Sequence, residues 1–235
     1  MERKYGRVML KLSGEILAGN FGFGLDFNAI NNICGEIAEV SREGIAISMV
    51  VGGGNIIRGS QTVEVERAQA DYMGMLGTVI NALALQDVLE RLGCPTRVQS
   101  AIEMREVAEP VIRRRAIRHL EKGRIVIFAA GIGSPYFSTD TTAALRASEI
   151  GADCVIKATK VDGIYDKDPS KFENAEKMKT VSYNDAIRMQ LRVMDAAAFS
   201  LCEDNKIPII VFNVLKKGNL RRLLLQNEEM GSIVS

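Results

Sequence analysis

The sequence predicts an α/β fold, a three-layer α/β/α sandwich in which helices cover both faces of a mainly parallel β-sheet. Several short runs of β-branched and apolar residues end at a glycine or a small polar residue, and stretches with helical spacing lie between them. Runs that are apolar nearly throughout are typical of strands buried on both faces. The 235 residues suffice for one large domain, so we expect a single domain over 1–235.

The predicted strands are the apolar runs themselves. They cover residues 7–12, 46–51, 96–99, 124–130, 154–158 and 208–212.

The predicted helices lie between these strands and cover residues 27–44, 72–92, 103–121, 141–150, 183–190 and 193–205. Residues 27–44 place Ile30, Ile33, Ile37 and Val40 on one face. The stretch 72–92 is apolar nearly all round, which predicts a buried helix or a subunit interface and therefore self-association. Residues 162–180, rich in Asp, Lys and Pro, are the best candidate for a mobile loop.

Composition excludes several classes of function. Lys and Arg number 30 against 29 Asp and Glu, so bulk positive charge does not favour nucleic-acid binding. His119 is the only histidine, which excludes a multi-histidine metal site within one chain. The four cysteines are far apart and form no Cys-x-x-Cys pair, which argues against zinc and disulfides and indicates a reducing cytoplasm.

The N-terminal segment and the longest uncharged stretch give no membrane signal. The first apolar run is interrupted by Lys11 within a few residues, unlike a signal peptide. Residues 72–86 contain Thr78, Asn81 and Gln86, and the stretch is too short and polar to span a bilayer. We therefore expect a cytoplasmic protein.

The chemistry is expected at the carboxyl ends of the strands, where ligands bind in such sheets. Three glycine-rich loops near 52–58, 131–140 and 159–168 lead into helices and offer free N–H groups to anions. The chain contains no Gly-Lys dipeptide, which excludes a Walker A loop, and neither Gly-x-Gly sequence continues to a dinucleotide fingerprint. The loops therefore predict one or two phosphorylated ligands held by a less common design.

Lys11 and Arg58 are the cations placed to meet those phosphates. Lys11 interrupts an apolar strand, and a buried ammonium is costly unless it meets an anion. The alternative is a lysine that extends from the strand end into solvent. Gly52-Gly53-Gly54-Asn55 alone could be an ordinary turn, but Arg58 follows four residues after Gly54 and supplies a cation at the same place.

Six motifs together resemble those of the bacterial UMP kinases, members of the amino-acid kinase family that are unrelated to the P-loop nucleoside monophosphate kinases. The resemblance covers essentially the whole chain, in order. The motifs are Lys-Leu-Ser-Gly-Glu at 11–15, Gly-Gly-Gly-Asn-Ile-Ile-Arg-Gly at 52–59, Asp-Tyr-Met-Gly-Met at 71–75, Gly-Ser-Pro-Tyr-Phe-Ser-Thr-Asp at 133–140, Lys-Ala-Thr-Lys-Val-Asp-Gly-Ile-Tyr at 157–165 and Val-Met-Asp at 193–195. Ile132 and Ser134 replace a threonine and an asparagine that are more frequent in the family, so the family's side-chain hydrogen bonds at these two positions are not carried over, whereas backbone contacts are.

The resemblance implies the amino-acid kinase fold and transfer of the ATP γ-phosphoryl group to UMP. The implied catalytic residues are Lys11, Asp140, Lys160 and Asp195. The implied ATP-binding residues are Lys11, Leu12, Ser13, Gly14, Gly54, Arg58, Thr159, Tyr165 and Asp168. The implied UMP-binding residues are Gly53, Asp71, Ile132, Gly133, Ser134, Pro135, Tyr136, Phe137, Ser138 and Thr139. Mg²⁺ is expected to arrive on the ATP phosphates with few protein ligands.

Several of these residues also have purely structural interpretations. Asp140 and Asp195 could each be the N-cap of a following helix, and a catalytic role does not exclude capping. Asp71 could favour a helix start through the dipole alone, although the resemblance makes it the acceptor of a ribose hydroxyl. Tyr165 could simply pack on the core.

The resemblance also implies regulation and assembly. Such enzymes are typically hexamers, activated by GTP and inhibited by UTP at the UMP site, and Arg97 and Arg124 correspond to arginines of their GTP site. Exposed charges at strand edges are the alternative for both arginines. At Gln86 and Glu90 the better-known pattern has an arginine and a histidine, which predicts weak GTP coupling. The N-terminal part is expected to serve UMP binding and oligomerisation, and residues 150–235 to serve ATP binding.

Two other functions remain open on the sequence. Another enzyme of the same fold, such as an acetylglutamate, carbamate or aspartate kinase, would keep the Lys-Leu-Ser-Gly and Gly-Gly-Gly features but is not expected to carry Asp-Tyr-Met-Gly-Met. A non-catalytic nucleotide-binding module is the second alternative, and the presence of Lys11, Asp140, Lys160 and Asp195 argues against it.

Overall fold

The computed structural model describes residues 4–57, 65–167, 169, 171–172, 174–191 and 193–235. The strands are β1 (Arg7–Leu12), β2 (Ala46–Val51), β3 (Thr96–Ser100), β4 (Glu109–Pro110), β5 (Ile125–Ala129), β6 (Cys154–Thr159), β7 (Ile164–Tyr165), β8 (Lys177–Met178), β9 (Thr180–Val181), β10 (Ile209–Asn213) and β11 (Ser232–Val234). The helices are α1 (Gly14–Leu17), α2 (Phe27–Arg42), α3 (Arg67–Arg91), α4 (Arg113–Glu121), α5 (Thr139–Ile150), α6 (Tyr183–Arg188), α7 (Ala196–Asp204) and α8 (Asn219–Leu225).

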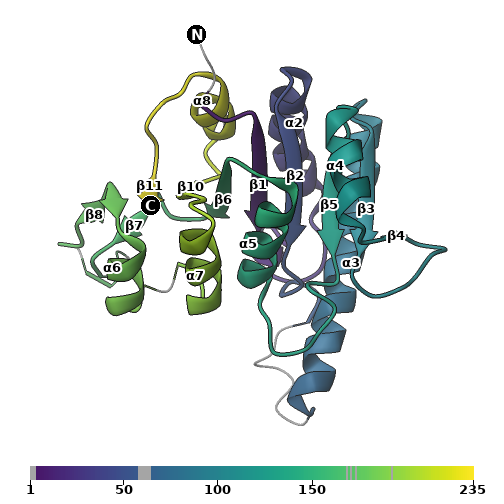
Figure 1. Cartoon of the computed structure of the whole chain (residues 1–235), viewed down its shortest axis with the longest axis horizontal. Coiled ribbons are helices and arrows are strands. Elements are labelled where there is room, and N and C mark those ends of the chain that lie inside the picture. The colour runs from purple at the N-terminus through teal and green to yellow at the C-terminus, as the bar shows by residue number, and fades with distance from the viewer. Residues whose placement is uncertain (1–3, 58–64, 168, 170, 173, 192) are drawn as a thin grey trace.

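Within the described residues, a nine-stranded sheet has the order β4-β3-β5-β2-β1-β6-β10-β11-β9, and β7 pairs separately with β8. All neighbours in the large sheet are parallel except β10 and β11. Helices α1, α2, α3 and α8 share one apolar core with one face of the sheet, and α4, α5, α6 and α7 share a second core with the other face. Figure 1 shows these helices around the sheet, and the arrangement confirms the predicted three-layer sandwich.

Strand β1 lies in the interior of the sheet and determines where the chemistry is located. Its register pairs Lys11 with Val50 on β2 and with Lys157 on β6. Because the strands run parallel, the carboxyl ends of β1, β2, β5, β6 and β10 meet at one edge, as expected for ligand binding in this class of sheet.

The sequence predicted the interior strands and most helices, but some boundaries were wrong. Residues 103–112 are not helical, and α4 begins only at Arg113. Pro110 lies within that stretch, and it disfavours helix in the residue before it and removes one amide donor. Helix α3 begins at Arg67, so Asp71 lies one turn inside the helix rather than at its start.

Several short elements escaped the sequence analysis. These are α1, α8, β4, β9, β11 and the pair β7–β8. The pair β7–β8 lies inside the stretch 162–180 that was predicted to be a loop. All of these elements are short, and a segment of two to seven residues carries little periodic signal.

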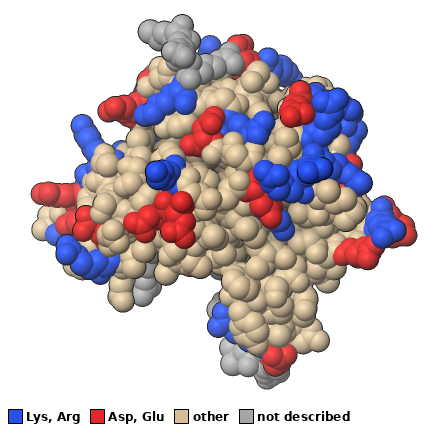
Figure 2. Space-filling model, in the orientation of Figure 1, with Lys and Arg blue, Asp and Glu red and all other residues tan. Residues whose placement is uncertain are grey.

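Helix α3 is long and protrudes from the body of the molecule in Figure 1. By length and composition it is the one helix in the described part of the chain that could cross a membrane, and 56% of its apolar window is buried inside this fold. Near its N-terminal end, Tyr72, Leu76 and Ile80 are exposed at spacings of four residues and therefore share a face. Figure 2 shows the protruding end as mostly uncharged.

Candidate active site

Two lysines from adjacent strands converge on one carboxylate near the centre of the sheet edge. Lys11 of β1 and Lys157 of β6 are register partners. Lys11 Nζ lies 2.7 Å from Asp140 Oδ1, and Lys157 Nζ lies 2.8 Å from Asp140 Oδ2. The three side chains are only 9%, 15% and 15% exposed. Asp140 therefore pairs with Lys11 and Lys157, whereas Lys160, the other lysine implied to be catalytic, pairs with Glu15.

Burial and charge act in opposite directions on this cluster. Burial alone would raise the pKa of Asp140, but the two ammonium groups outweigh it and hold that pKa below its usual value. Burial and the neighbouring charge of Lys11 lower the pKa of Lys157, although Asp140 and Asp195 partly restore it. The three groups in contact carry one excess positive charge, and Asp195 acts on Lys157 as a further negative charge. A bound anion such as a phosphate would give the two nearly buried ammonium groups an additional partner.

A second carboxylate organises the start of α5. Asp195 is the N-cap of α7, because its Oδ1 accepts a hydrogen bond from Ala198 N at 2.8 Å. It also accepts hydrogen bonds from the hydroxyls of Thr141, at 2.9 Å, and of Ser138. The N-cap interpretation of Asp195 is thus confirmed. That of Asp140 is wrong, because Ser138 caps α5 and leaves the Asp140 carboxylate to the lysines.

The glycine-rich loop after β2 packs closely against α3 and the start of α1. A Cβ at Gly53 would lie 2.4 Å from Gly74 O, and one at Gly14 would lie 2.3 Å from Asn55 Oδ1. Any larger residue at these two positions would collide with neighbouring segments of the chain, so close packing, and not only turn formation, requires glycine there. A Cβ built at Gly54 would meet no described residue within 4 Å, so on that side the described part of the chain leaves space for a ligand.

Two buried asparagines hold this loop in place. Asn55 and Asn81 exchange hydrogen bonds through their side-chain amides at 2.9 and 2.7 Å. Asn81 Nδ2 also donates to Gly52 O at 2.7 Å. The amide pair anchors the loop to the middle of α3, and it explains a polar residue within an otherwise apolar stretch.

On one side of the lysine pair, the loop 130–138 approaches α3. Tyr136 N donates to Asp71 Oδ2 at 2.8 Å, and the Arg67 guanidinium lies 5.3 Å from the centre of the Tyr136 ring. Ser138 and Asp195 join these residues in lining a cavity of about 470 Å³. The structure thus brings Asp71 and the predicted uracil loop together.

The remaining residues predicted in that loop lie between β5 and α5. Gly133 has a left-handed φ of 83°, and a Cβ there would lie 2.8 Å from Ala101 O. Tyr136 also has a positive φ of 72°, and its side chain and that of Phe137 are exposed. Ile132, Ser134 and Pro135 belong to the same connection, and Thr139 is the first residue of α5.

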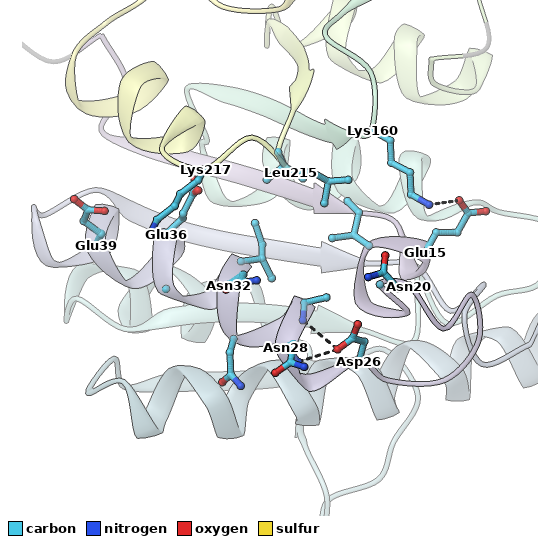
Figure 3. Close-up of a pocket in the computed structure, with 17 residues that line it drawn as sticks. Glu15, Asn20, Asp26, Asn28, Asn32, Glu36, Glu39, Lys160, Leu215 and Lys217 are labelled. Atoms are coloured by element: carbon cyan, nitrogen blue, oxygen red, sulfur yellow. Dashed lines mark hydrogen bonds and ion pairs between the residues drawn. The ribbon is translucent and has the colours of Figure 1, made fainter. Parts of the chain in front are cut away.

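On the other side of the lysine pair, the loop after β6 carries the residues predicted for ATP. The Thr159 hydroxyl donates to Val161 O at 2.7 Å and shapes the loop. Lys160 extends to Glu15 of α1, with Nζ 3.5 Å from Oε2, and Tyr165 belongs to β7. Lys160 and Glu15 also line a larger cavity of about 760 Å³ between α2 and the β10–α8 connection (Figure 3). Arg58 and Asp168 lie outside the described residues.

The segment that follows β1, which is predicted to bind phosphate, connects the two sides. Leu12 is the last residue of β1, Ser13 precedes α1 and Gly14 begins that short helix. Leu12 O accepts a hydrogen bond from Gly52 N at 2.9 Å, which joins this segment to the glycine-rich loop.

The two arginines predicted for a GTP site lie away from this centre, and both have partners within the chain. Arg97 Nη1 lies 3.3 Å from Glu90 Oε1 and donates to Thr96 O. Arg124 Nη1 lies 3.1 Å from His119 Nδ1. Because an arginine can only donate, that nitrogen accepts, and His119 Nε2 carries the hydrogen that reaches Glu109 Oε2 at 3.0 Å.

Lys157 is the main residue of the site that sequence reasoning missed. It interrupts an apolar strand just as Lys11 does, so the same signal was present. A lysine in an apolar strand does not by itself identify a site residue. The strand order does, because it places Lys157 beside Lys11. Asn81 and Thr141 were missed because their partners lie 26 and 54 positions away in sequence.

The described residues include no group of three His, Cys, Asp or Glu side chains placed to hold a metal ion. The carboxylates of Asp140 and Asp195 already accept ammonium or hydroxyl hydrogen bonds. This donor set does not form a protein cage for a divalent cation, which prefers oxygen ligands in larger number.

Comparison with known proteins gives consistent matches over the whole chain. The sequence profile of the amino acid kinase family matches residues 6–213. A UMP kinase structure from Bacillus anthracis is 40% identical, with a TM-score of 0.95, and the match covers 98% of this chain and 96% of that one. A UMP kinase from Ureaplasma parvum is 37% identical, with a TM-score of 0.92 and complete coverage of both chains. A uridylate kinase from Archaeoglobus fulgidus is 25% identical, with a TM-score of 0.71, and the match covers 97% of this chain and 99% of that one.

Proposed function

Because this chain belongs to the amino acid kinase family, we propose that it is a UMP kinase, which transfers the γ-phosphoryl group of ATP to the phosphate of UMP and yields ADP and UDP. The observation that carries the proposal is the arrangement of Lys11, Lys157 and Asp140, whose excess positive charge lies where two phosphate-binding loops meet. A transferred phosphoryl group is the anion that best fits it.

The reaction needs no protein base. The nucleophile is an oxygen of the UMP phosphate, which is largely deprotonated at neutral pH. A bond forms between that oxygen and Pγ, and the bond between Pγ and the β–γ bridging oxygen breaks, so that ADP leaves with the electron pair. No proton has to move, which is consistent with a centre that contains lysines and carboxylates and no histidine.

Each residue of the centre then has a definite task. Lys11 and Lys157 neutralise charge on the phosphoryl group during its transfer, and Asp140 holds both ammonium groups in position through its two ion pairs. Asp195 fixes the start of α5 through Ser138 and Thr141 and thereby fixes Asp140 in the first turn. Lys160 reaches the ATP phosphates when it leaves Glu15, a change that needs only a half-exposed ion pair to break.

The two substrates occupy opposite sides of the centre. UMP lies in the cavity next to Asp71, with the ribose on the Asp71 carboxylate, uracil against residues 132–139 and phosphate at Gly53. ATP lies over Ser13, Gly14 and Gly54, with adenosine along Thr159 and Tyr165. The N-terminal part thus mainly serves UMP, although it also contributes to the ATP phosphates, and the part after residue 150 mainly serves ATP.

Mg²⁺ is expected to be carried by ATP, where it would neutralise charge on the phosphates and supplement the two lysines. No described cluster of carboxylates forms a cage for it, so Asp140 and Asp195 would hold its water shell through hydrogen bonds.

The assembly and its regulation are part of the same proposal. The exposed apolar face of α3 supports self-association, and we propose a homohexamer. We further propose a cytoplasmic enzyme of pyrimidine biosynthesis, with GTP as an activator near Arg97 and Arg124 and UTP as an inhibitor at the UMP site.

A coupled assay of ADP release tests the activity directly. The purified protein is given ATP and Mg²⁺ with UMP, CMP, dUMP, acetylglutamate or carbamate as the acceptor, and UDP is identified by chromatography. We expect turnover with UMP and at least a hundredfold lower kcat/KM with the amino-acid acceptors. Turnover with an amino acid alone would favour another kinase of this fold, and ATP binding without turnover on any acceptor would favour a non-catalytic module.

A further inference from the structure

The end of β10 lies beside the end of β6, and one side chain from β10 holds the loop that follows β6. Asn213 is the last residue of β10 and is the register partner of Thr159. Its Nδ2 donates to Lys160 O at 2.8 Å, and its Oδ1 accepts from Leu215 N at 2.9 Å. The amide orientation is fixed, because a backbone carbonyl can only accept and a backbone N–H can only donate.

Asn213 is itself anchored from α8 and α2. The side chain of Asn219, which is buried, donates to Asn213 O at 2.8 Å. Asn219 begins α8, whose N-terminal N–H groups at Gly218 and Leu220 donate to the Glu36 carboxylate of α2 at 2.6 and 3.3 Å. A chain of hydrogen bonds therefore leads from the rigid helix α2 to the carbonyl of Lys160. Figure 3 shows its two ends, with Glu36 below Lys217 and Lys160 at the opposite rim of the cavity.

The loop that Asn213 holds has few other supports. After Thr159 the backbone leaves the sheet and forms bends up to Gly163. Besides Asn213, its described contacts to β10 and the β10–α8 connection are the hydrogen bonds from Val214 N to Thr159 O and from the Thr159 hydroxyl to Phe212 O, both at 3.2 Å, and the exposed ion pair of Lys216 with Asp162, which contributes little to order. Hydrogen bonds between Thr159 and Val161 shape the loop from within, and the Asn213 side chain ties its Lys160 carbonyl to β10.

We infer that Asn213 is a positioning residue for the donor nucleotide, acting through the Lys160 carbonyl on the loop 159–163. The inference rests on the proposed function, in which that loop receives ATP. By fixing the peptide at Lys160, Asn213 removes conformational freedom that ATP binding would otherwise have to remove. It touches no reacting atom, so its loss weakens ATP binding and leaves the chemical step nearly intact.

Two substitutions separate this role from a purely local one. Asn213→Ala removes both side-chain hydrogen bonds. Asn213→Asp keeps the acceptor for Leu215 N but loses the donor and turns a carboxylate oxygen toward the Lys160 carbonyl. We expect both variants to raise the KM for ATP about five- to tenfold, with kcat and the KM for UMP changed less than twofold.

Asn205→Ala is the matched control. Asn205 also donates through Nδ2 to a backbone carbonyl, that of Leu201 at 2.8 Å, but it lies at the end of α7. That variant is expected to keep the KM for ATP within twofold of the wild type. An Asn213→Asp variant that matches the wild type while Asn213→Ala is impaired would show that only the turn at Leu215 matters, and it would overturn the inference.

Calorimetry with AMP-PNP makes the test independent of the acceptor. Both Asn213 variants are expected to bind AMP-PNP about five- to tenfold more weakly than the wild type. Unchanged affinity in both variants, or a wild-type protein that does not bind AMP-PNP, would overturn the inference. A wild type that binds AMP-PNP but does not phosphorylate UMP would overturn the proposed function alone. If Asn213→Ala does not fold, Asn213→Asp decides the question.

Discussion

A charged residue inside a buried strand carries chemical information, and Lys11 is the clearest case in this chain. It lies among apolar neighbours in β1, and the residue as a whole, backbone included, is 7% exposed. Its ammonium group meets Asp140 instead of solvent. Snorkelling to solvent, the alternative considered from the sequence, is therefore wrong. The ammonium contributes to a local excess of positive charge, and this is the property that a phosphoryl-transfer centre requires.

Lys11→Met should leave the fold intact and remove charge stabilisation of the phosphoryl group in transit. We expect kcat to fall by about 10²–10³, with little loss of UMP affinity in calorimetry. Lys122→Met, which removes an exposed lysine at the end of α4, should keep normal kcat. A folded Lys11→Met variant with near-normal kcat would refute the role of Lys11.

Asp140→Asn should destabilise the fold, because it leaves two nearly buried ammonium groups without their counterion. The expected loss is about 3–5 kcal/mol at neutral pH in urea denaturation. The folded pKa of Asp140 is lowered from its ordinary value of 3.8, so its stabilising contribution exists above that value and is lost as the pH falls through the folded pKa.

The difference between wild type and Asp140→Asn should therefore be largest near pH 7 and shrink below about pH 4. Asp87→Asn is the control, because the pair of Asp87 with Arg91 is exposed and should contribute little at any pH. A difference that does not change with pH would show that the ion pairs do not stabilise the fold.

Asp71→Asn should weaken UMP binding about 5- to 150-fold, since a hydrogen bond to a charged acceptor contributes about 1–3 kcal/mol. Asp71 Oδ2 already accepts from Tyr136 N, so the ribose hydroxyl is expected on the other oxygen. The affinity for AMP-PNP should stay within twofold. Weaker AMP-PNP binding with unchanged UMP binding would mean that the two substrate sides are reversed.

The residues that the sequence revealed are those whose type is unusual in their local setting. Lys11 was found as a charge in an apolar strand, and Gly53 and Gly54 as a run of glycines before a helix. The residues that it did not reveal, such as Asn213 and Asn81, are ordinary in their local setting. Their roles depend on partners brought together by the strand order, and a single sequence does not contain that order.

At the scale of elements, buried parallel strands were predictable because burial on both faces requires continuous apolar runs. Helix α4 was predicted about ten residues too long, because the predicted amphipathic stretch was carried back across Pro110 to Glu103. Helix α8 was missed because the residue that precedes it, Gly218, has no side chain to cap the helix. The capping carboxylate belongs to Glu36 of α2, which is far away in sequence.

The exposed face of α3 predicts the effect of a charge on assembly. Leu76 is 50% exposed and lies between Tyr72 and Ile80 on the same face. Leu76→Glu should therefore shift the protein to smaller species in analytical ultracentrifugation, because a buried carboxylate in an apolar interface is unfavourable. Ile187→Glu, at an exposed apolar residue of α6, should leave the assembly unchanged. A Leu76→Glu variant that sediments like the wild type would exclude this face as the interface.

At the scale of the whole molecule, the internal partners of Arg97 support weak regulation by GTP. Glu90 already pairs with Arg97, and Gln86 donates to Thr96 O instead of offering a cation. A triphosphate would have to compete with Glu90 for that arginine. We therefore expect GTP to couple by less than about 1 kcal/mol, below the usual range for an allosteric pair.

The measurement is the initial rate against GTP concentration, at subsaturating ATP and fixed free Mg²⁺. Glu90→Gln should strengthen the activation, because it removes the competing anion. Asp87→Asn, one turn away and paired with Arg91, is the control. Activation of the wild type by more than tenfold would contradict the argument.

The interior place of β1 also bears on how the chain is synthesised. This strand is made first, yet its neighbour β6 follows far behind, so that contacts such as that of Arg7 with Asp153 span 146 positions. While the ribosome produces the intervening residues, one edge of β1 has no neighbour, and an unpaired apolar edge can recruit other nascent chains. Lys11 places a charge in that strand, and charges of this kind oppose edge-to-edge association. We therefore expect Lys11, the residue proposed to act in phosphoryl transfer, also to oppose association of the chain before the sheet is complete.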